Sequence, residues 1–313
     1  MKNVLLTGVA GFIGSSLATT FLKKGYSITG IDNLKTGYID NIPQDVIFVN
    51  GDCADPATYE NAEIKKEKFD IIVHMAGQSS GEVSFDDPCL DLSDNCLSTL
   101  RLLEFARTIS CKKLIFASSM SVYGEVKEGH INETHSTQPL SMYAVGKLAS
   151  ESYLRLFERY NIDSVSLRLF NIYGPGQNMS NLRQGMASIY LAQALDLGKI
   201  EVKGKPNRFR DLVFIDDVVR VIGEFMDRNF KGSEVYNVCT GIKTEVTELV
   251  DVIKNTLGDE SLPVSYIEGT PGDQFGIVGD NSKLRSYIGD IEFTDLETGI
   301  SKFVSSIDML PEK

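Results

Sequence analysis

A tyrosine and a lysine stand four residues apart near the start of LSMYAVGKLASESYLRLFERY, residues 140–160. The spacing of apolar residues predicts a helix over 141–160, and side chains four residues apart on a helix share a face. Tyr143 and Lys147 could therefore form a proton-transfer device in which the ammonium stabilises a phenolate. A solvated pair on an amphipathic helix would have the same spacing, so the rest of the chain must distinguish these alternatives.

A glycine-rich stretch at the start of the chain, LLTGVAGFIGS, places Gly8, Gly11 and Gly14 between a predicted strand and a predicted helix. Glycine lets the backbone turn tightly and approach a pyrophosphate, which the free N–H groups at the helix N-terminus then bind. Asp32 ends the next predicted strand, 18 residues after Gly14. The pattern predicts a dinucleotide site, although a plain strand-to-helix turn would also place glycines here.

The charges near this turn favour NAD over NADP. A carboxylate at Asp32 can accept both ribose hydroxyls of the adenosine half, and it would repel a 2′-phosphate. Lys35 is the only nearby cation, and it weakens this preference. Asp52 follows the third predicted strand, where it could meet the adenine amino group or cap the strand end. The sequence does not decide between these two roles.

The elements around these residues alternate between short β-branched runs and helical patterns. We predict strands over 2–8, 27–32, 46–52, 69–76, 112–119 and 163–170, and helices over 12–24, 55–66, 88–109 and 141–160. Apolar strands that alternate with helices indicate a parallel sheet covered on both faces. Right-handed crossovers then give an α/β, doubly wound sheet of the Rossmann type. We assign residues 1–170 to this NAD-binding domain.

After residue 170 the alternation ends in the loop NIYGPGQNMSNLRQG, which precedes a predicted helix near 184–198. Shorter strands and helices then continue to the end of the chain, with breaks at KGKPNRF and GTPGDQFG. This pattern predicts a smaller C-terminal substrate-binding lobe over 171–313. The stretch LVFIDDVVRVIGEFM lies within residues 212–237, which we expect to return to the first domain as a strand and a helix.

The composition excludes several classes of function. The net charge of −12 argues against nucleic-acid binding, and no apolar run is long enough to span a membrane. The N-terminus runs from a short apolar start directly into the glycine-rich turn, unlike a signal peptide, so we expect a cytoplasmic protein. The 5 cysteines lack a metal-like spacing and the 3 histidines lack a nucleophile context. We therefore expect no metal site and no Ser-His-Asp hydrolase.

With these motifs in order, the chain resembles the extended short-chain dehydrogenase/reductases of the NAD-dependent epimerase/dehydratase family, which act on nucleotide sugars. The resemblance spans nearly the whole chain and is carried by TGVAGFIGS, VHMAGQSS, DNCLSTLRLLEFAR, FASSMSVYG, YAVGK, LRLFNIYGPGQ, RDLVFIDDVV, YNVCTG and PGD. UDP-glucose 4-epimerases have the nearest pattern. The resemblance implies NAD as the cofactor and a nucleotide diphosphate sugar as the partner. It also implies a homodimer formed through a four-helix bundle of the helices near 88–109 and 141–160.

The resemblance assigns the tyrosine and the lysine a chemical role. It implies that the Tyr143 phenolate removes a proton from a sugar hydroxyl while hydride leaves the same carbon, with Ser119 hydrogen-bonded to the reacting oxygen. Tyrosine has a pKa of about 10, so a base near neutrality needs a decrease of about 3 units, or about 4 kcal/mol. A cation about 4 Å away supplies an energy of that order. We therefore expect Lys147, helped by the positive nicotinamide, to lower the pKa of Tyr143.

The resemblance also implies further contacts with the two ligands. Beside Tyr143 and Lys147, the expected cofactor-binding residues are Gly8, Gly11, Phe12, Ile13, Gly14, Asp32, Asn33, Asp52, Cys53, Ala76, Gly77, Asn95, Ser118 and Phe170. The expected substrate-binding residues are Ser79, Ser121, Asn171, Asn181, Leu182, Lys203, Arg210 and Asp273. An arginine such as Arg210 suits a diphosphate because its guanidinium can donate two parallel hydrogen bonds.

Departures from the family pattern narrow the reaction. Relatives that eliminate water carry Asp-Glu after the catalytic serine, whereas Met120 and Ser121 stand there in this chain. Reversible oxidation and reduction at one carbon remains, as in 4-epimerisation. The sugar and the base stay open, because Thr270 replaces a common arginine and Lys203 a common aromatic residue. Cations that could meet the diphosphate, or be solvated surface charges, are Arg183, Lys203 and Arg208.

Three functions are consistent with these residues. The first is an NAD-dependent nucleotide-sugar 4-epimerase of the UDP-glucose or UDP-N-acetylhexosamine type, which acts through a transient 4-keto sugar and keeps its NAD. The second is a dehydrogenase or reductase on a related nucleotide sugar, with net turnover of NAD(H). The third is a non-catalytic NAD-binding scaffold, although the chain keeps Tyr143, Lys147 and Ser119.

Overall fold

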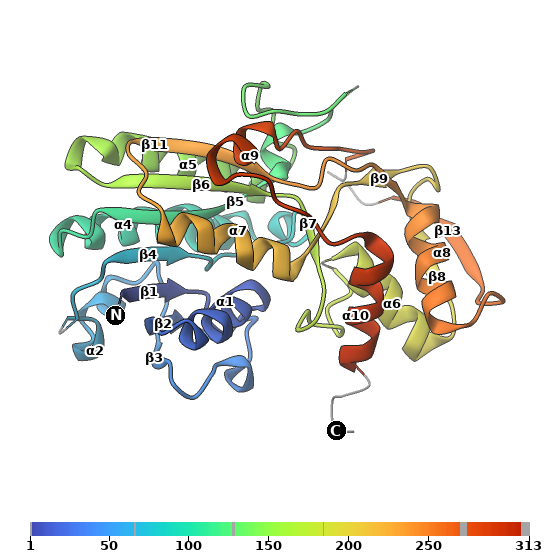
Figure 1. Cartoon of the computed structure of the whole chain (residues 1–313), viewed down its shortest axis with the longest axis horizontal. Helices are drawn as coiled ribbons and strands as arrows, with labels where there is room; N and C mark the ends of the chain where they lie inside the picture. The colour runs from blue at the N-terminus through green and yellow to red at the C-terminus, as the bar shows by residue number, and fades with distance from the viewer. Residues whose placement is uncertain (1, 66, 127–128, 184, 270–273, 308–313) are drawn as a thin grey trace.

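The computed structural model describes residues 2–65, 67–126, 129–183, 185–269 and 274–307. At its centre is a 7-stranded parallel sheet with the order β11–β6–β5–β4–β1–β2–β3 (Figure 1). The strands are β1 Asn3–Thr7, β2 Ser27–Asp32, β3 Ile47–Asn50, β4 Ile71–His74, β5 Lys113–Ser119, β6 Asp163–Leu169 and β11 Ser233–Val238. The expected doubly wound sheet of the Rossmann type is confirmed.

Alternate residues of the strands face opposite sides of the sheet, and each side has its own apolar core. The covering helices are α1 Phe12–Lys23, α4 Ser98–Thr108, α5 Met142–Phe157 and α7 Ile215–Asp227. Leu5, Ile31 and Ile72 pack in the core that contains α4 and α5. Val4 and Leu6 face the other core, which contains α1 and α7. Figure 1 shows α1 and α7 on the near side of the sheet, and burial on both faces explains why the strands are almost continuously apolar.

The prediction of a single helix over 55–66 is wrong for the residues that the structure describes there. Its place is taken by a 3-10 turn, η2 (Pro56–Glu60), and a short helix, α2 (Ala62–Lys65). The side chain of Asp55 caps the turn by accepting a hydrogen bond from the backbone N–H two residues on, at 2.9 Å. Asn61 then has extended backbone angles, φ −58° and ψ 135°, which separate the turn from the helix.

The helix expected over 88–109 is present but contains one wider turn. It consists of α3 (Pro88–Leu92), a π-helical turn η4 (Ser93–Leu97) and then α4. Asp87 caps its start, because its side chain accepts a hydrogen bond from the backbone N–H three residues on at 2.9 Å. Short π-helical turns are frequent at functional sites, and this one carries Asp94 and Asn95.

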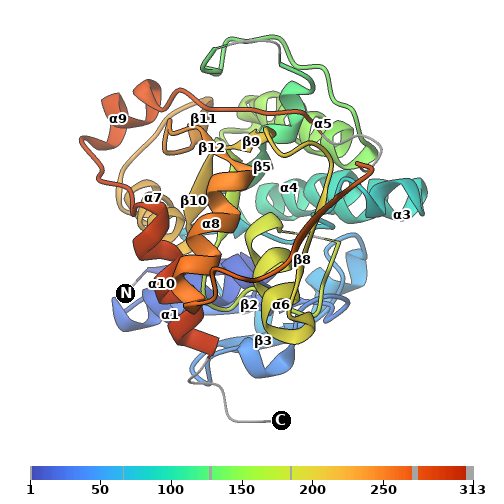
Figure 2. The same cartoon turned by 90° about the vertical axis from the view of Figure 1, so that its right-hand side faces the viewer.

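Most of the chain after β6 lies beside the sheet (Figures 1 and 2). Its further helices are α6 Met186–Leu197, α8 Val246–Leu257, α9 Ser282–Ile288 and α10 Leu296–Ile307. Its further strands are β7 Asn171–Tyr173 paired with β10 Leu212–Phe214, β8 Ile200–Lys203 paired with β13 Val264–Ile267, and β9 Phe209–Arg210 paired with β12 Thr244–Glu245. Single turns are η1 Ile39–Asn41, η3 Val83–Phe85, η5 Met120–Tyr123 and η6 Glu158–Tyr160. No helix in the described ranges combines the length and apolar character needed to cross a bilayer.

Two segments of this later part return to the sheet. α7 follows β10 and packs against α1, and β11 extends the sheet by pairing with β6. The strand expected at the start of LVFIDDVVRVIGEFM is β10, which pairs with β7 outside the main sheet, whereas β11 joins the edge of the main sheet after α7. The domain boundary at residue 170 stays a prediction.

The strand order creates a ligand crevice at one edge of the sheet. β1 and β4 are neighbours, and the chain continues from β1 to β2 on one side and from β4 to β5 on the other. Ligands of open parallel sheets bind outside the carboxyl ends of the strands at such a switch point. The residues that follow β1 and β4, beginning with Gly8 and Met75, border this crevice.

His74 ends β4 and is fully buried. Its Nδ1 lies 2.7 Å from Thr7 Oγ1 and its Nε2 lies 3.1 Å from Thr99 Oγ1, so both ring nitrogens have hydroxyl partners. Burial, helped by the charge of Lys147, lowers the pKa of His74 to about 3. An unfolded chain would protonate this ring near its ordinary pKa of about 6.5. The folded protein therefore keeps His74 neutral in mild acid, where the unfolded chain does not.

We predict that this buried imidazole destabilises the fold in mild acid. Below about pH 6.5 the unfolded chain binds a proton at His74 and the folded chain does not, so stability falls as the pH falls. The loss from this site is about 1.4 kcal/mol at about pH 5.5. Urea unfolding at about pH 7.5 and about pH 5.5 measures it. His74→Gln should lose less stability over this interval by about that amount, whereas the exposed control His135→Gln should lose as much as the parent. Equal losses in His74→Gln and the parent would contradict the prediction.

Candidate active site

The turn after β1 brings three glycines to the edge of the sheet. Gly8 has φ +74°, a conformation that favours glycine, and a Cβ there would lie 2.7 Å from Ala76 N. A Cβ at Gly14 would collide with the carbonyl oxygen of Gly8. Gly11 N donates to Gly8 O at 3.1 Å, and Gly11 begins α1 without a side-chain cap. The first N–H groups of α1 can therefore serve a ligand, as they do in dinucleotide-binding turns.

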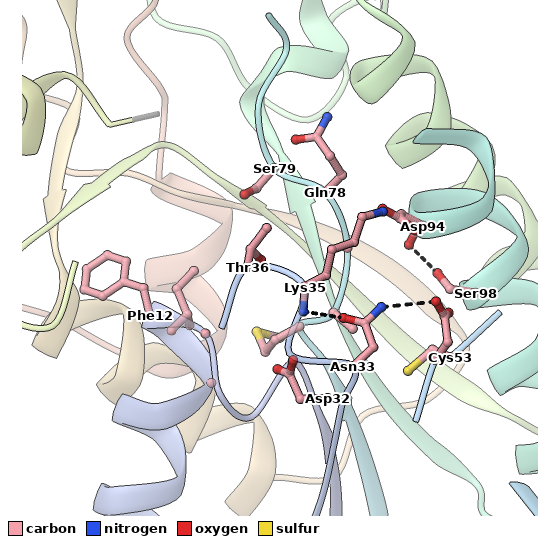
Figure 3. Close-up of a pocket in the computed structure, with 18 of the residues that line it drawn as sticks. Phe12, Asp32, Asn33, Lys35, Thr36, Cys53, Gln78, Ser79, Asp94 and Ser98 are labelled. Atoms are coloured by element: carbon pink, nitrogen blue, oxygen red, sulfur yellow. Dashed lines mark hydrogen bonds and ion pairs between the residues drawn. The ribbon is translucent and has the colours of Figure 1, made fainter. Parts of the chain in front are cut away.

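A cavity of about 320 Å³ lies against this turn (Figure 3). Figure 3 shows Phe12 on one side of it, with Asp32, Asn33 and Cys53 on another. The expected cofactor-binding residues in its lining are Gly8, Gly11, Phe12, Ile13, Gly14, Asp32, Asn33, Asp52, Cys53, Ala76 and Gly77. The lining also includes two residues that were expected to bind substrate, Ser79 and Asn181. The structure thus gathers residues from the loops after β1, β2, β3, β4 and β7 around one space.

Asp32 and Asp52 hold the turns at the ends of their strands. Asp32 is 9% exposed, and its carboxylate accepts hydrogen bonds from Ala10 N and Leu34 N, both at 2.9 Å. Each carboxylate oxygen has a further lone pair, so both can also accept a ribose hydroxyl. Asp52 accepts a hydrogen bond from Asn33 Nδ2 at 3.1 Å and one from the backbone two residues on at 2.8 Å. The strand-end role of Asp52 is therefore present, and its contact with adenine stays a prediction.

The backbone after β4 is shaped for close approach by a ligand. Gly77 has φ +148°, and a Cβ there would lie 2.6 Å from Asn95 Oδ1 and 3.3 Å from Lys147 Nζ. Asn95 is buried and donates from Nδ2 to Asp91 Oδ1 at 3.0 Å, while its Oδ1 has no partner among the described residues. A buried oxygen without a partner beside a cavity is the arrangement that a ligand donor completes. The residues present therefore fit a dinucleotide.

Tyr143 and Lys147 are buried, with exposed fractions of 9% and 4%, on one face of α5. Ser141 caps α5 by accepting a hydrogen bond from the N–H three residues on at 3.2 Å, which places Tyr143 in the first turn. Lys147 Nζ lies 4.9 Å from the ring centre of Phe116 and 5.8 Å from that of Tyr143. Ser119 ends β5 and forms a hydrogen bond with Tyr143. The alternative of a solvated helical pair is therefore wrong.

Burial shifts both pKa values toward the neutral groups. It raises the pKa of Tyr143 to about 12, opposed by the hydrogen bond with Ser119 and reinforced by the charge of Asp91. It lowers the pKa of Lys147 to about 8, opposed by the charge of Asp91. In the chain alone, burial therefore dominates the pKa of Tyr143, and the expectation that Lys147 lowers it with the help of the positive nicotinamide stays a prediction. The cause of both shifts is desolvation, because the buried phenolate loses its hydration and the buried ammonium is itself weakened.

Asp91 is a site residue that sequence patterns did not reveal. It lies on α3 with 2% exposure, and its Oδ1 accepts hydrogen bonds from Gln78 Nε2 at 2.9 Å and from Asn95 Nδ2 at 3.0 Å. Burial raises its pKa, opposed by these hydrogen bonds and by the charge of Lys147. Asp91 therefore joins the loop after β4 to Asn95, and its charge raises the pKa of Lys147 against the effect of burial. Its one sequence signal is the four-residue spacing to Asn95 on a predicted helix.

A buried ion pair fixes α5 against the sheet. Glu151, one turn after Lys147, accepts hydrogen bonds from Arg168 Nε at 2.9 Å and Nη2 at 2.7 Å, and both side chains are 6% exposed. Ser118 on β5 donates to Glu151 Oε1 at 2.5 Å. Neither Ser118 nor the buried Phe170 is among the described residues that line the cofactor cavity. Their contacts with the cofactor stay predictions.

A second cavity, of about 470 Å³, extends from the loop after β4 to the later part of the chain. Ser79 lines both cavities, so the two spaces adjoin at this loop. The expected substrate-binding residues in its lining are Ser79, Ser121, Asn171, Leu182, Lys203 and Arg210. Met120 also lines it, and neither position 120 nor position 121 brings a carboxyl group. Thr270 and Asp273 lie outside the described residues.

Acidic side chains accompany the cations of this second cavity. Arg183 Nε lies 3.0 Å from Glu82 Oε1, and its Nη1 lies 2.7 Å from Asp86 Oδ2. Lys203 Nζ lies 3.8 Å from Glu82 Oε2, and Arg210 donates to backbone carbonyls at 2.8 and 3.2 Å. A diphosphate that binds Arg183 or Lys203 would therefore compete with the Glu82 carboxylate. Glu82 is a second residue that sequence patterns did not identify.

Metal ligands do not gather in the described part of the chain. No group of 3 or more His, Cys, Asp and Glu side chains there could hold an ion. The cysteines Cys53, Cys89, Cys96, Cys111 and Cys239 are free thiols.

The chain is similar to known proteins over almost its whole length. The sequence model of the NAD dependent epimerase/dehydratase family matches residues 4–239. A UDP-glucose 4-epimerase of Mycolicibacterium smegmatis is 34% identical, over 96% of this chain and 96% of its own. The structure of UDP-glucose 4-epimerase from Thermotoga maritima with UDP-glucose has a TM-score of 0.92 and 31% identity, covering 98% of each chain. The structure of UDP-glucose 4-epimerase from Thermus thermophilus with NAD has a TM-score of 0.89 and 32% identity, covering 98% of this chain and 99% of that one.

We predict that removing one partner of the buried Glu151–Arg168 pair costs more stability than removing both. Glu151→Met leaves a buried guanidinium without its carboxylate, at a cost of about 3–5 kcal/mol, whereas Glu151→Met combined with Arg168→Met avoids the unpaired charge. Urea unfolding measures the free energies. The matched control Glu224→Gln, which removes one member of an exposed pair with Arg228, should change stability by less than about 1 kcal/mol. A Glu151→Met protein as stable as the parent would contradict the prediction.

Proposed function

The chain belongs to the NAD dependent epimerase/dehydratase family, and from this premise we propose that it is an NAD-dependent nucleotide-sugar 4-epimerase. We propose a substrate of the UDP-glucose or UDP-N-acetylhexosamine type. The UDP-glucose 4-epimerases to which it is similar, of which one was solved with UDP-glucose and another with NAD, support this proposal. NAD is the cofactor of the family.

The observation that carries the proposal is the burial of Tyr143, Lys147 and Ser119 beside residues that line the two cavities. A Cβ at Gly77, in the lining of the first cavity, would lie 3.3 Å from Lys147 Nζ. Ser119 Oγ lies 3.2 Å from the hydroxyl of Ser121, in the lining of the second cavity. None of the three groups is among the described residues that line either cavity, but Lys147 lies beside the lining of the first cavity and Ser119 beside that of the second.

The proposed roles follow from the chemistry of these groups. Bound NAD supplies a hydride acceptor and a positive charge. The Tyr143 phenolate accepts the proton of the sugar C4 hydroxyl and returns it after the keto sugar has presented its other face. Ser119 donates a hydrogen bond to the reacting oxygen, and Lys147 stabilises the phenolate. Met120 and Ser121 carry no acid that could protonate a leaving hydroxyl, which favours epimerisation over elimination.

We also propose which part of the chain binds each ligand. Residues 1–170, with 212–237, would hold NAD, and residues 171–313 would hold the sugar nucleotide. Support comes from the second cavity, which adjoins the cofactor cavity and takes much of its lining from the later part of the chain. The proposed substrate-binding residues are Ser79, Ser121, Asn171, Asn181, Leu182, Lys203, Arg210 and Asp273, the last of which lies outside the described residues.

We also propose a homodimer formed through the helices of α3–α4 and α5. Leu92, Leu97 and Val145 are exposed on these elements, at 57%, 38% and 50%. Exposed apolar side chains on neighbouring helices are what a bundle with a second copy would cover. We propose a cytoplasmic location as well, which the free thiols support because disulfides are rare in that reducing compartment.

Replacing Tyr143 by phenylalanine tests the proposed chemistry. We expect Tyr143→Phe to lower kcat by about 10²–10⁴-fold, because the proton acceptor is lost while the buried ring remains. The assay follows UDP-glucose and UDP-galactose, and the two UDP-N-acetylhexosamines, by NMR without added NAD. The control Tyr266→Phe removes an exposed hydroxyl from β13 and should leave kcat unchanged.

The same assay separates the proposal from its competitors. An epimerase interconverts the C4 epimers and leaves no lasting NADH absorbance. Accumulating NADH with an oxidised sugar would instead identify a dehydrogenase, and bound NAD with unchanged sugars would identify a scaffold. Full turnover by Tyr143→Phe on a true substrate would refute the mechanism.

A charged substitution tests the dimer. We expect the parent to have the mass of a dimer by light scattering and Val145→Glu to have that of a monomer, because a carboxylate cannot be buried in an apolar bundle without a partner. The control Leu197→Glu places the same charge at a position on α6 that is 57% exposed and should leave the dimer intact. A monomeric parent, or a Val145→Glu dimer of unchanged stability, would rule the interface out.

A further inference from the structure

Lys35 is the one cationic side chain among the described residues that line the cofactor cavity. The same lining contains three acids, Asp32, Asp52 and Asp94. Lys35 Nζ pairs with Asp94 Oδ2 at 2.7 Å. Figure 3 shows the lysine side chain extending from the loop after β2 toward Asp94, away from Asp32. The single positive charge of the cavity is thus already matched by a carboxylate of the chain.

The local backbone fixes the position of both partners. Leu34 has φ +59°, an uncommon left-handed conformation, and its N–H donates to Asp32 Oδ1 at 2.9 Å. Lys35 N then donates to Asn33 Oδ1 at 3.1 Å. Asp94 stands on the π-helical turn with only 11% of its side chain exposed, against 42% for Lys35. The carboxylate is therefore held by the fold, whereas the long lysine side chain can move.

The position of Asp32 indicates where a 2′-phosphate would lie. An acid at the end of the second strand binds the ribose hydroxyls in NAD sites, and a nearby basic side chain accommodates the 2′-phosphate in NADP sites. Lys35 is the side chain placed for that second role. We propose that Asp94 is a specificity-determining residue that favours NAD over NADP by holding Lys35 away from the 2′ position of the cofactor.

Asp32 and Asp94 have different parts in this selection. Asp32 repels a 2′-phosphate directly. Asp94 acts indirectly, because it binds the Lys35 ammonium, which would otherwise offset that repulsion. A partly exposed ion pair contributes little to stability, so the effect of Asp94 belongs to cofactor choice and not to folding. The inference rests on the NAD dependence of the family and is independent of which sugar is the substrate.

Competition between the two dinucleotides tests the inference on the holoenzyme. The purified protein is equilibrated with mixtures of NAD and NADP, and the bound dinucleotides are identified by chromatography after denaturation. Asp94→Asn should raise the bound ratio of NADP to NAD about tenfold, because a released ammonium can donate a charged hydrogen bond to the phosphate. In a Lys35→Gln background the same change should raise it less than about threefold, because only direct repulsion is relieved. High salt should reduce both effects.

The matched control is Glu104→Gln on α4, which makes the same change in net charge at an exposed pair with Arg101. It should leave the bound ratio unchanged. An unchanged ratio in Asp94→Asn, or an equal increase with and without Lys35, would overturn the inference. A protein that exchanges dinucleotides as expected but fails to epimerise any sugar would contradict the proposed function and leave the role of Asp94 in place.

Discussion

The position of α5 depends on an ion pair that lies almost entirely out of contact with water. Glu151 and Arg168 meet through two hydrogen bonds of 2.9 and 2.7 Å at 6% exposure each, and Ser118 adds a third from the neighbouring strand. Burying two charges is unfavourable unless they pair with good geometry, so this arrangement strongly disfavours any other rotation of α5. Because Tyr143, Lys147 and Glu151 follow one another at intervals of four residues, the same pair determines which face of the helix turns toward the sheet.

The sheet supplies the second constraint, since its strand order determines where a ligand can approach that face. The connections after β1 and β4 lead to opposite sides of the switch point, and the loop after β4 lines both cavities. Asp91 ties this loop to the site by accepting hydrogen bonds from Gln78 and Asn95. The loop that lines both cavities is therefore joined to α3 and η4 by a few hydrogen bonds, and the buried Lys147 lies beside it at Gly77.

Local patterns predicted the sheet and the cofactor turn well, because both depend on short-range rules. Gly8 and Gly14 lie so close to backbone atoms that a larger side chain would collide with them. Parallel strands that are buried on both faces are apolar along most of their length. Such rules did not predict the π-helical turn. They also did not predict the ion pairs of Lys35 with Asp94 and of Lys203 with Glu82. Each depends on which loops meet across the cavity, and a one-dimensional pattern does not record that. The prediction of a helix over 55–66 was wrong for a local reason, because the backbone at Asn61 is extended and separates the 3-10 turn from α2.

The direction of the tyrosine pKa shift shows an effect that sequence spacing does not reveal. Proximity in sequence suggested that a lysine one turn away would stabilise a phenolate, but burial acts on both groups and makes each charged form less favourable. A positive group beside the pair, such as the oxidised nicotinamide of bound NAD, would offset part of this cost. Under the proposed mechanism, desolvation by the chain and the charge of the cofactor therefore act on the phenolate in opposite directions.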